Sequence, residues 1–266
     1  MKRRISRLGW VRDLPDPRDH VYSAPLGVLQ ALPASVDLDP KFPIYDQGRI
    51  GSCTANALAG AVQFDRLKNG QNPDFVPSRL FIYYNERVIE GDPGNDGGAQ
   101  LRDGIKTLQQ QGVCPETEWP YDDTPAPYEG GPFPVGSRPA TNPPQTCYND
   151  AVNYEVVNYQ RLNQNLSQLQ GCLAAGFPFA FGFTVFDGWY NQNPHPAVIP
   201  VPSTTDSPVG GHAVLCIGYD NSKSLFKIRN SWGPEAGDEG YFYMPYAYVT
   251  EPTLANDLWV INSIKD

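Results

Sequence analysis

The pattern of apolar residues changes from helical to β along this chain, and that change constrains the fold more than any other feature. Apolar side chains recur at helical spacing over 53–68 and again over 101–108. From residue 179 onward the chain carries short runs of aromatic and β-branched residues separated by turn residues, among them HAVLCIGYD and GYFYMPY. A helical first half and a β second half predict an α+β protein with two lobes and a cleft between them.

Three segments fall outside this division. Residues 1–45 are rich in proline, aspartate and glycine without a helical period, which predicts an extended arm. Residues 122–150 are rich in proline and glycine and predict a long surface excursion. Residues 187–208 form a further loop that either lines or covers the cleft.

The composition becomes globular near Leu32, which predicts an N-terminal extension at 1–31 and one domain at 32–266. Within that domain we expect a helical lobe over roughly 46–120 and a β lobe over roughly 150–250.

The charge of the chain excludes some partners. The net charge of -9 argues against nucleic-acid binding, which needs a surplus of lysine and arginine. Residues 1–12 hold five basic and no acidic side chains, so the remainder carries 15 basic and 29 acidic groups, a net of -14. This asymmetry suggests that the extension docks on the body in cis, although a solvated terminus has the same composition.

No apolar run approaches the ~20 residues that span a bilayer, so we expect no membrane partner. The basic start, MKRRISRLGW, lacks the apolar stretch of a secretory signal. The location therefore stays open between the cytoplasm and export by a route without such a signal. We expect a monomer.

The five cysteines form no CxxC pair and the chain has only three histidines, so we expect neither a metal site nor a cofactor. Cys172 lies in a predicted helix and Cys216 in a predicted strand, so both should be reduced and buried. The pairing of the remaining cysteines is left open by the sequence.

Cys53 stands at the start of a predicted helix, in QGRIGSCTANALAG. Unpaired N–H groups and the helix dipole favour a thiolate there, and the thiolate is the nucleophilic form. Gly51 and the neighbouring small residues would let a substrate backbone approach. A cysteine in front of an alanine-rich helix is also common as a simple core residue.

A base and its orienting partner follow later in the chain. His212 begins an apolar strand behind two glycines, and Asn230 in KIRNSWG follows 18 residues later, one hairpin away. An asparagine can fix the imidazole tautomer and leave the other nitrogen for the thiol, while Trp232 covers the bond between them. The alternatives are a satisfied core histidine and a turn asparagine beside a core tryptophan.

Together these motifs closely resemble the papain-like cysteine peptidases. The order Gln…Cys…His…Asn, with QG six residues before the cysteine, GHAV at the histidine and NSWG at the asparagine, is that family's signature. The segments NDGGAQLRDGIKTLQQQGVCPETEWPY and GDEGYFYMPY are similar to further family elements, and the match covers most of the chain from Leu32. It looks nearest to bacterial members of the xylellain type.

The resemblance implies a fold, an activity and roles. The fold would be papain-like, with a helical N-terminal lobe and an antiparallel, barrel-like β lobe. Cys53 would be the nucleophile, His212 the base, Asn230 its orienting group and Gln47 a donor to the oxyanion. Substrate-binding positions would be Gly97, Gly98, Trp232 and Gly51, and the substrates would be polypeptides.

The chain also departs from the family pattern. Thr54 follows the nucleophile, where the family usually has an aromatic residue, and Ile50 replaces a frequent disulfide cysteine. The extension at 1–31 is shorter than the usual prosegment, yet it is extended and carries aromatic residues. We therefore expect a cysteine endopeptidase, made as a zymogen with this arm over its cleft. An acyl or amide transferase using the same dyad and an inactive binding protein are the alternatives.

Overall fold

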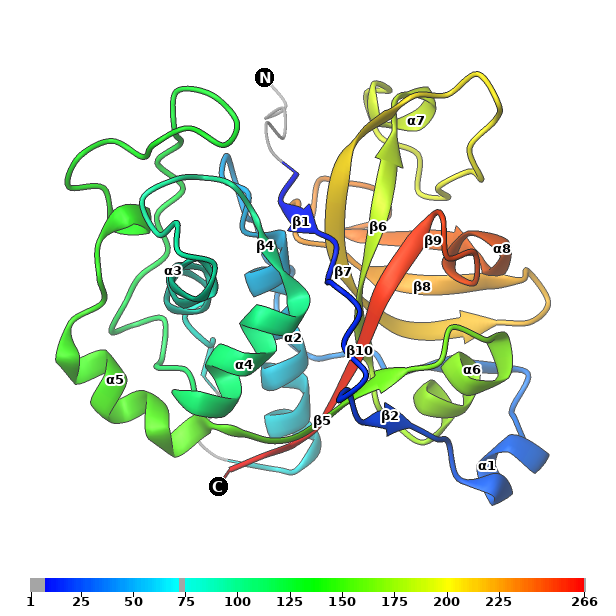
Figure 1. The fold of residues 1–266 in the computed structure, drawn as a ribbon. Coiled ribbons are helices and arrows are strands. Elements are labelled where there is room, and N and C mark those ends of the chain that lie inside the picture. The colour runs from blue at the N-terminus through cyan, green and yellow to red at the C-terminus, as the bar shows by residue number, and fades with distance from the viewer. Residues whose placement is uncertain (1–7, 72–74, 266) are drawn as a thin grey trace.

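The computed structural model describes residues 8–71 and 75–265. The three longest helices lie on one side of the molecule and a twisted sheet with several short helices on the other, and the N-terminal segment runs between them (Figure 1). The predicted division into a helical and a β part is confirmed. None of the described helices is long and apolar enough to cross a membrane.

The helical part is built from α2 (Cys53–Lys68), α3 (Arg79–Ile89) and α4 (Leu101–Gln110). Helix α2 is buried along most of its length because α3, α4 and the sheet all pack against it. The hydroxyl of Ser78 caps α3 by accepting a hydrogen bond from the N–H of Phe81, as predicted.

The excursion over 122–150 is anchored more firmly than its composition predicts. It contains the 3₁₀ turn η1 (Arg138–Ala140) and leads into α5 (Gln145–Ala151) and a second turn, η2 (Val152–Tyr154). Phe133 and Cys147 are buried in the core of the helical part. All five cysteines are free and buried, which includes the two that the sequence predicts to be reduced.

The second part is one eight-stranded sheet in which the strands follow the order β2-β5-β10-β6-β7-β8-β9, with β3 paired to β7. The sheet does not close into a barrel among the described strands, and only the β2–β5 pair is parallel. Its later strands are β5 (Val156–Leu162), β6 (Phe179–Phe186), β7 (Pro208–Asp220), β8 (Leu225–Arg229), β9 (Tyr241–Pro245) and β10 (Ala255–Ile264). Three helices accompany the strands: α6 (Leu166–Ala174), α7 (Asp187–Tyr190) and α8 (Tyr246–Val249).

The N-terminal segment is docked along its described length. Strand β1 (Trp10–Val11) pairs in parallel with β4 (Ala99–Gln100), and β2 (Val21–Tyr22) pairs with β5. A short helix, α1 (Leu26–Gln30), packs on α6, and β3 (Ser35–Asp37) leads into the domain. The prediction of an arm without helix is therefore wrong at α1. We refer to residues 8–31 as the arm.

Candidate active site

Cys53 is the first residue of α2 and is fully buried. Its helix is fixed by polar contacts on either side of the cysteine. The Ser52 hydroxyl lies 2.5 Å from the Tyr121 hydroxyl, and the Thr54 hydroxyl donates to the Glu86 carboxylate at 2.8 Å. Thr54, at the position where the family usually has an aromatic residue, thus donates a hydrogen bond to the buried carboxyl group of Glu86.

The position of the thiol is defined by backbone groups from both parts of the molecule. Backbone hydrogen bonds reach Cys53 from Ala213 on β7, from Gly9 of the arm and from Thr54. Burial nevertheless raises the pKa of the thiol to about 12, because loss of water outweighs these hydrogen bonds. The expectation of a lowered pKa from the helix terminus alone is wrong for this arm-bound state.

His212 and Asn230 form the predicted pair. The Nε2 atom of His212 lies 2.7 Å from Oδ1 of Asn230, an oxygen that also accepts from the N–H of Ser231. An amide oxygen only accepts, so Nε2 carries the proton and Nδ1 is left as the acceptor. Nδ1 is buried without a hydrogen-bond partner. Because the adjacent residue Ala213 contacts the thiol, this unpaired nitrogen belongs to the same site as Cys53.

Burial also controls the protonation of His212. It lowers the imidazole pKa to about 4, while the hydrogen bond to Asn230 acts in the opposite direction. Trp232 stacks on the imidazole at 4.6 Å between ring centroids, and Phe183 meets it edge-on at 5.7 Å. With the arm in place, both the thiol and the imidazole are therefore neutral.

Gln47 is fully buried beside this group. Its side-chain nitrogen donates to the carbonyl of Ile50 at 3.1 Å, and its oxygen accepts from the Ser231 hydroxyl at 2.8 Å. Ser231 follows Asn230 directly, so one short segment holds both the histidine partner and the glutamine. The amide of Gln47 is thereby held in one orientation.

Of the glycines named from the sequence, two lie against the arm. A Cβ atom at Gly98, whose φ is +76°, would collide with the backbone of Gly9, and one at Gly51 would lie 3.4 Å from the Gly9 Cα. Gly97 is exposed and makes no such contact. Gly51 also donates its N–H to the carboxylate of Asp96 at 2.9 Å.

The backbone of the arm lies against the thiol of Cys53. Gly9 contacts the thiol, and its carbonyl accepts from the N–H of Ala99 at 2.8 Å. The Gly9 carbonyl is therefore paired with β4, and the neighbouring side chains of Leu8 and Trp10 pack against Gly210, Gly182 and Gly211 of the sheet.

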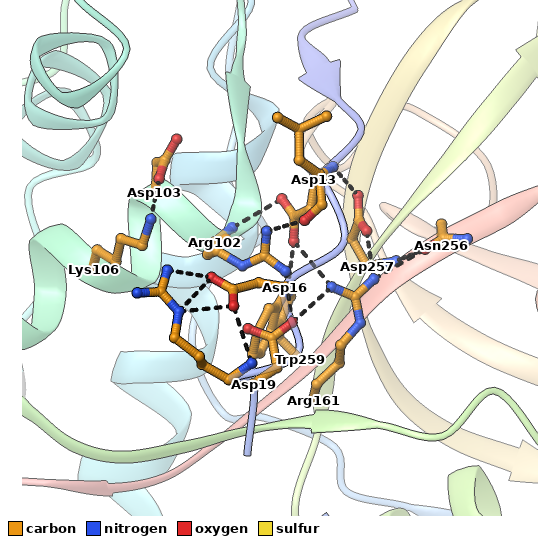
Figure 2. A network of polar contacts seen from close by, with 12 residues as sticks. Asp13, Asp16, Asp19, Arg102, Asp103, Lys106, Arg161, Asn256, Asp257 and Trp259 are labelled. Atoms are coloured by element: carbon orange, nitrogen blue, oxygen red, sulfur yellow. Dashed lines mark hydrogen bonds and ion pairs between the residues drawn. The ribbon is translucent and has the colours of Figure 1, made fainter. Parts of the chain in front are cut away.

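Beyond Trp10 a polar network fastens the arm to both parts of the molecule (Figure 2). Asp13 donates its N–H to Asp257 at 2.7 Å and accepts from the indole of Trp259 at 2.9 Å. Arg102 on α4 binds Asp19 at 2.6 Å, and Arg161 on β5 binds Asp257 at 2.8 Å. The sequence gives no sign of this network, since its members are separated by up to 246 residues.

A buried cysteine at a helix terminus, together with a histidine–asparagine pair on the facing sheet, defines a thiol hydrolase of the papain-like class. The chain matches the model of the papain family cysteine proteases over residues 32–258, and it belongs to that family. The resemblance stated from the motifs is thus confirmed, and the chain is a papain-family cysteine protease that acts on polypeptides.

Individual relatives agree with this assignment. The structure of xylellain, a cysteine protease from Xylella fastidiosa, is similar with a TM-score of 0.94 and 53% identity over 100% of this chain and 98% of that chain. An uncharacterized peptidase C1-like protein, L477, of Acanthamoeba polyphaga mimivirus is 35% identical over 98% of this chain and 89% of its own. The procathepsin B S9 of Trypanosoma congolense shares the fold at 17% identity, with a TM-score of 0.68 over 90% of this chain and 80% of that chain.

Proposed function

We propose that this chain is a cysteine endopeptidase that works through a Cys53–His212 dyad. Nδ1 of His212 takes the thiol proton as Sγ of Cys53 attacks the carbonyl carbon of the scissile peptide bond. The proton then passes to the departing amine, and a thioester remains on Cys53. Water, deprotonated by the same imidazole, hydrolyses the thioester and restores the thiol.

The observation that carries this proposal is the unpaired Nδ1 of His212 beside the terminus of α2. Its ring is held by the Asn230 bond on one side and by Trp232 on its face, so only Nδ1 is left to exchange a proton. The amide of Gln47 and the N–H of Cys53 would donate to the oxyanion that forms during attack.

We further infer that the arm inhibits the enzyme and must move before substrate binds. Gly9 fills the space in front of the thiol, and burial keeps both members of the dyad neutral. The arm is not itself presented as a substrate at this residue, because the Gly9 carbonyl is paired with Ala99. The chain is in this sense made as a zymogen.

A peptide-like epoxide inhibitor tests both statements. The full chain, its Cys53→Ala variant and its Gly9→Ala variant are incubated with the epoxide, and the mass and the modified residue are read. We expect one adduct on Cys53, none in Cys53→Ala and faster labelling in Gly9→Ala, because a methyl group at residue 9 would collide with Gly51 and loosen the arm.

No labelling in any variant would refute the endopeptidase mechanism. Equal labelling rates in the full chain and in Gly9→Ala would refute the inhibitory role of the arm. Product analysis with added amines separates hydrolysis from acyl transfer by the same dyad.

A further inference from the structure

Two thiols and two carboxyl groups meet between the end of α4 and α5. The Sγ atoms of Cys114 and Cys147 and a carboxylate oxygen of Glu118 all lie within 4.8 Å of one another. The carboxyl group of Asp150 is hydrogen-bonded to that of Glu118. Among the residues that the structure describes, no other group of three such ligand atoms comes together. None of these four side chains takes part in the proposed mechanism.

Each of two short segments supplies one thiol and one carboxylate. The segment CPETE carries Cys114 and Glu118 four residues apart, and CYND carries Cys147 and Asp150 three residues apart. The spacing of three in α5 places both of its side chains on one face of the helix. The absence of a CxxC pair predicts no metal site, but these mixed pairs are brought together only by the fold.

The first segment is held in place by its own backbone. The carbonyl of Cys114 accepts from the N–H of Ser78 at 2.8 Å, and the N–H of Glu118 donates to the carbonyl of Pro115 at 3.0 Å. The hydroxyl of Ser78 donates to the carbonyl of Trp119 at 2.8 Å. Cys114 and Glu118 are therefore positioned independently of any contact between the two thiols.

The charges that act on this group are negative. Those that act on Cys147 belong to Glu118 and Asp150, and Asp150 in turn acts on Glu118. Glu116, in the same segment as Glu118, is already paired with Arg79 at 2.6 Å. Two ionised carboxyl groups in contact repel each other, so a proton or a cation must lie between them. A bound cation would supply the positive charge that these neighbours lack.

The ligand types select the metal. Calcium and magnesium take oxygen ligands, whereas a site with thiolates suits zinc. Zinc binds cysteine sulfur at about 2.3 Å and carboxylate oxygen at about 2.0–2.2 Å, so the corners of its tetrahedron are roughly 3.4–3.8 Å apart. Side-chain rotation can bring atoms within 4.8 Å of one another to that spacing. Both sulfurs are buried while Glu118 is exposed, so an ion can enter from the carboxylate side.

We propose that Cys114, Glu118, Cys147 and Asp150 bind one zinc ion. Four protein ligands fill the tetrahedron and leave no open position, which is typical of structural rather than catalytic zinc. The ion replaces the two thiol protons and the proton shared by the carboxyl groups, so its binding weakens as the pH falls.

The ion would fasten the excursion over 122–150 to the end of α4. Its two cysteines are 33 residues apart, and closing such a loop stabilises a fold by restricting the unfolded chain. The excursion also supports the cleft, since Gly131 accepts from the N–H of Asp96 and Phe133 donates to the carbonyl of Gly94, both at 2.9 Å. Zinc should therefore raise the Tm of the whole domain.

Zinc binding is tested on the full chain carrying Cys53→Ala, because Cys53 and His212 could themselves bind zinc. The reduced protein is dialysed against buffer with zinc, and the zinc content per chain is measured by elemental analysis. Cobalt replaces zinc for absorption spectroscopy. We expect one zinc per chain, a sulfur-to-cobalt charge-transfer band and a Tm that rises with free zinc.

Variants in the same background locate the ion. Cys147→Ser should abolish the cobalt band and the rise in Tm. Glu118→Gln, at an exposed position, should weaken zinc binding by about 10–100-fold, and it serves where Cys147→Ser does not fold. Cys172→Ala removes a buried cysteine of α6, and Glu129→Gln alters an exposed glutamate of the excursion. These two are the matched controls and should bind zinc like their parent.

Three results would overturn the zinc site. The first is absence of zinc from the reduced Cys53→Ala chain. The second is zinc affinity that is unchanged in Cys147→Ser or in folded Glu118→Gln. The third is a disulfide between Cys114 and Cys147 that forms in air, with no zinc binding after its reduction. None of these measurements depends on catalysis, so failure of the zinc site is distinguishable from failure of the endopeptidase mechanism.

Discussion

Replacing Asp13 with asparagine should tighten the hold of the arm at neutral pH, although Asp13 belongs to an ion-pair network. Its carboxylate accepts from the indole of Trp259 and from the N–H of Arg102, and it lies 3.6 Å from Arg161. It is buried, and its nearest acidic neighbour, Asp257, is fully buried. In this network the carboxylates of Asp13, Asp19 and Asp257 share two guanidinium groups, those of Arg102 and Arg161.

The magnitude follows from the pKa of Asp13. Burial, followed by the charge of Asp257, raises this pKa from 3.8 to about 6 in the docked arm. The docked state thus binds the proton more tightly than the free arm, so docking is strongest at low pH and weakens as the pH rises through about 6. At 1.36 kcal/mol per pKa unit, the ionised carboxylate costs about 3 kcal/mol of docking free energy, roughly a hundredfold in the docking equilibrium.

Asparagine has the shape of the protonated acid and carries no charge at any pH, so Asp13→Asn avoids this cost. Both carboxylate oxygens of Asp13 accept hydrogen bonds, one from Arg102 and one from Trp259, and the amide nitrogen of asparagine cannot accept, so the variant loses one of the two bonds. We therefore expect a net tightening of about tenfold at neutral pH. The assay is the second-order rate of Cys53 alkylation by the epoxide, measured for the parent and the variant across about pH 4.5 to 8.

The ionisation of Cys53 and His212 affects the labelling rate of both proteins equally. Dividing one rate by the other therefore removes this effect. We expect the parent to label no faster than Asp13→Asn at the acidic end, and the ratio to rise with pH and to level off at about ten above about pH 6.5. A ratio that is independent of pH, or faster labelling of Asp13→Asn at neutral pH, would refute the reasoning.

Three further predictions concern the site and its support. Gln47→Ala should lower kcat by about 10²–10³ with little change in KM, because one oxyanion donor is lost; steady-state kinetics on a peptide substrate measures it. Gly98→Ala should speed epoxide labelling of Cys53, since a methyl group there is strained and collides with the arm, whereas Gly97→Ala at the exposed neighbour should leave the rate unchanged. Thr54→Val should lower the free energy of unfolding in urea by about 1–3 kcal/mol because the buried Glu86 loses its donor, and Thr54→Ser should restore most of it.

The local patterns of this sequence determine most of its elements. Helix α2 begins at Cys53 and ends at Lys68, as its spacing and the following Asn-Gly predict, because a long run of helix-forming residues with defined ends depends on nearby residues alone. The motifs around Cys53, His212 and Asn230 are also local, since each is a short segment whose backbone must place one side chain. They are sufficient to identify the family.

Only the tertiary structure decides what surrounds these groups. The arm has little periodicity, so its docking depends on contacts with residues more than 80 positions away, such as Asp13 with Arg102 and Trp10 with Asp257. The pKa of Cys53 shows the same division, since the helix terminus predicts a thiolate and the burial of the thiol in the folded chain produces a neutral thiol. Burial is the sum of contributions from distant segments, and no local pattern in the sequence records that sum.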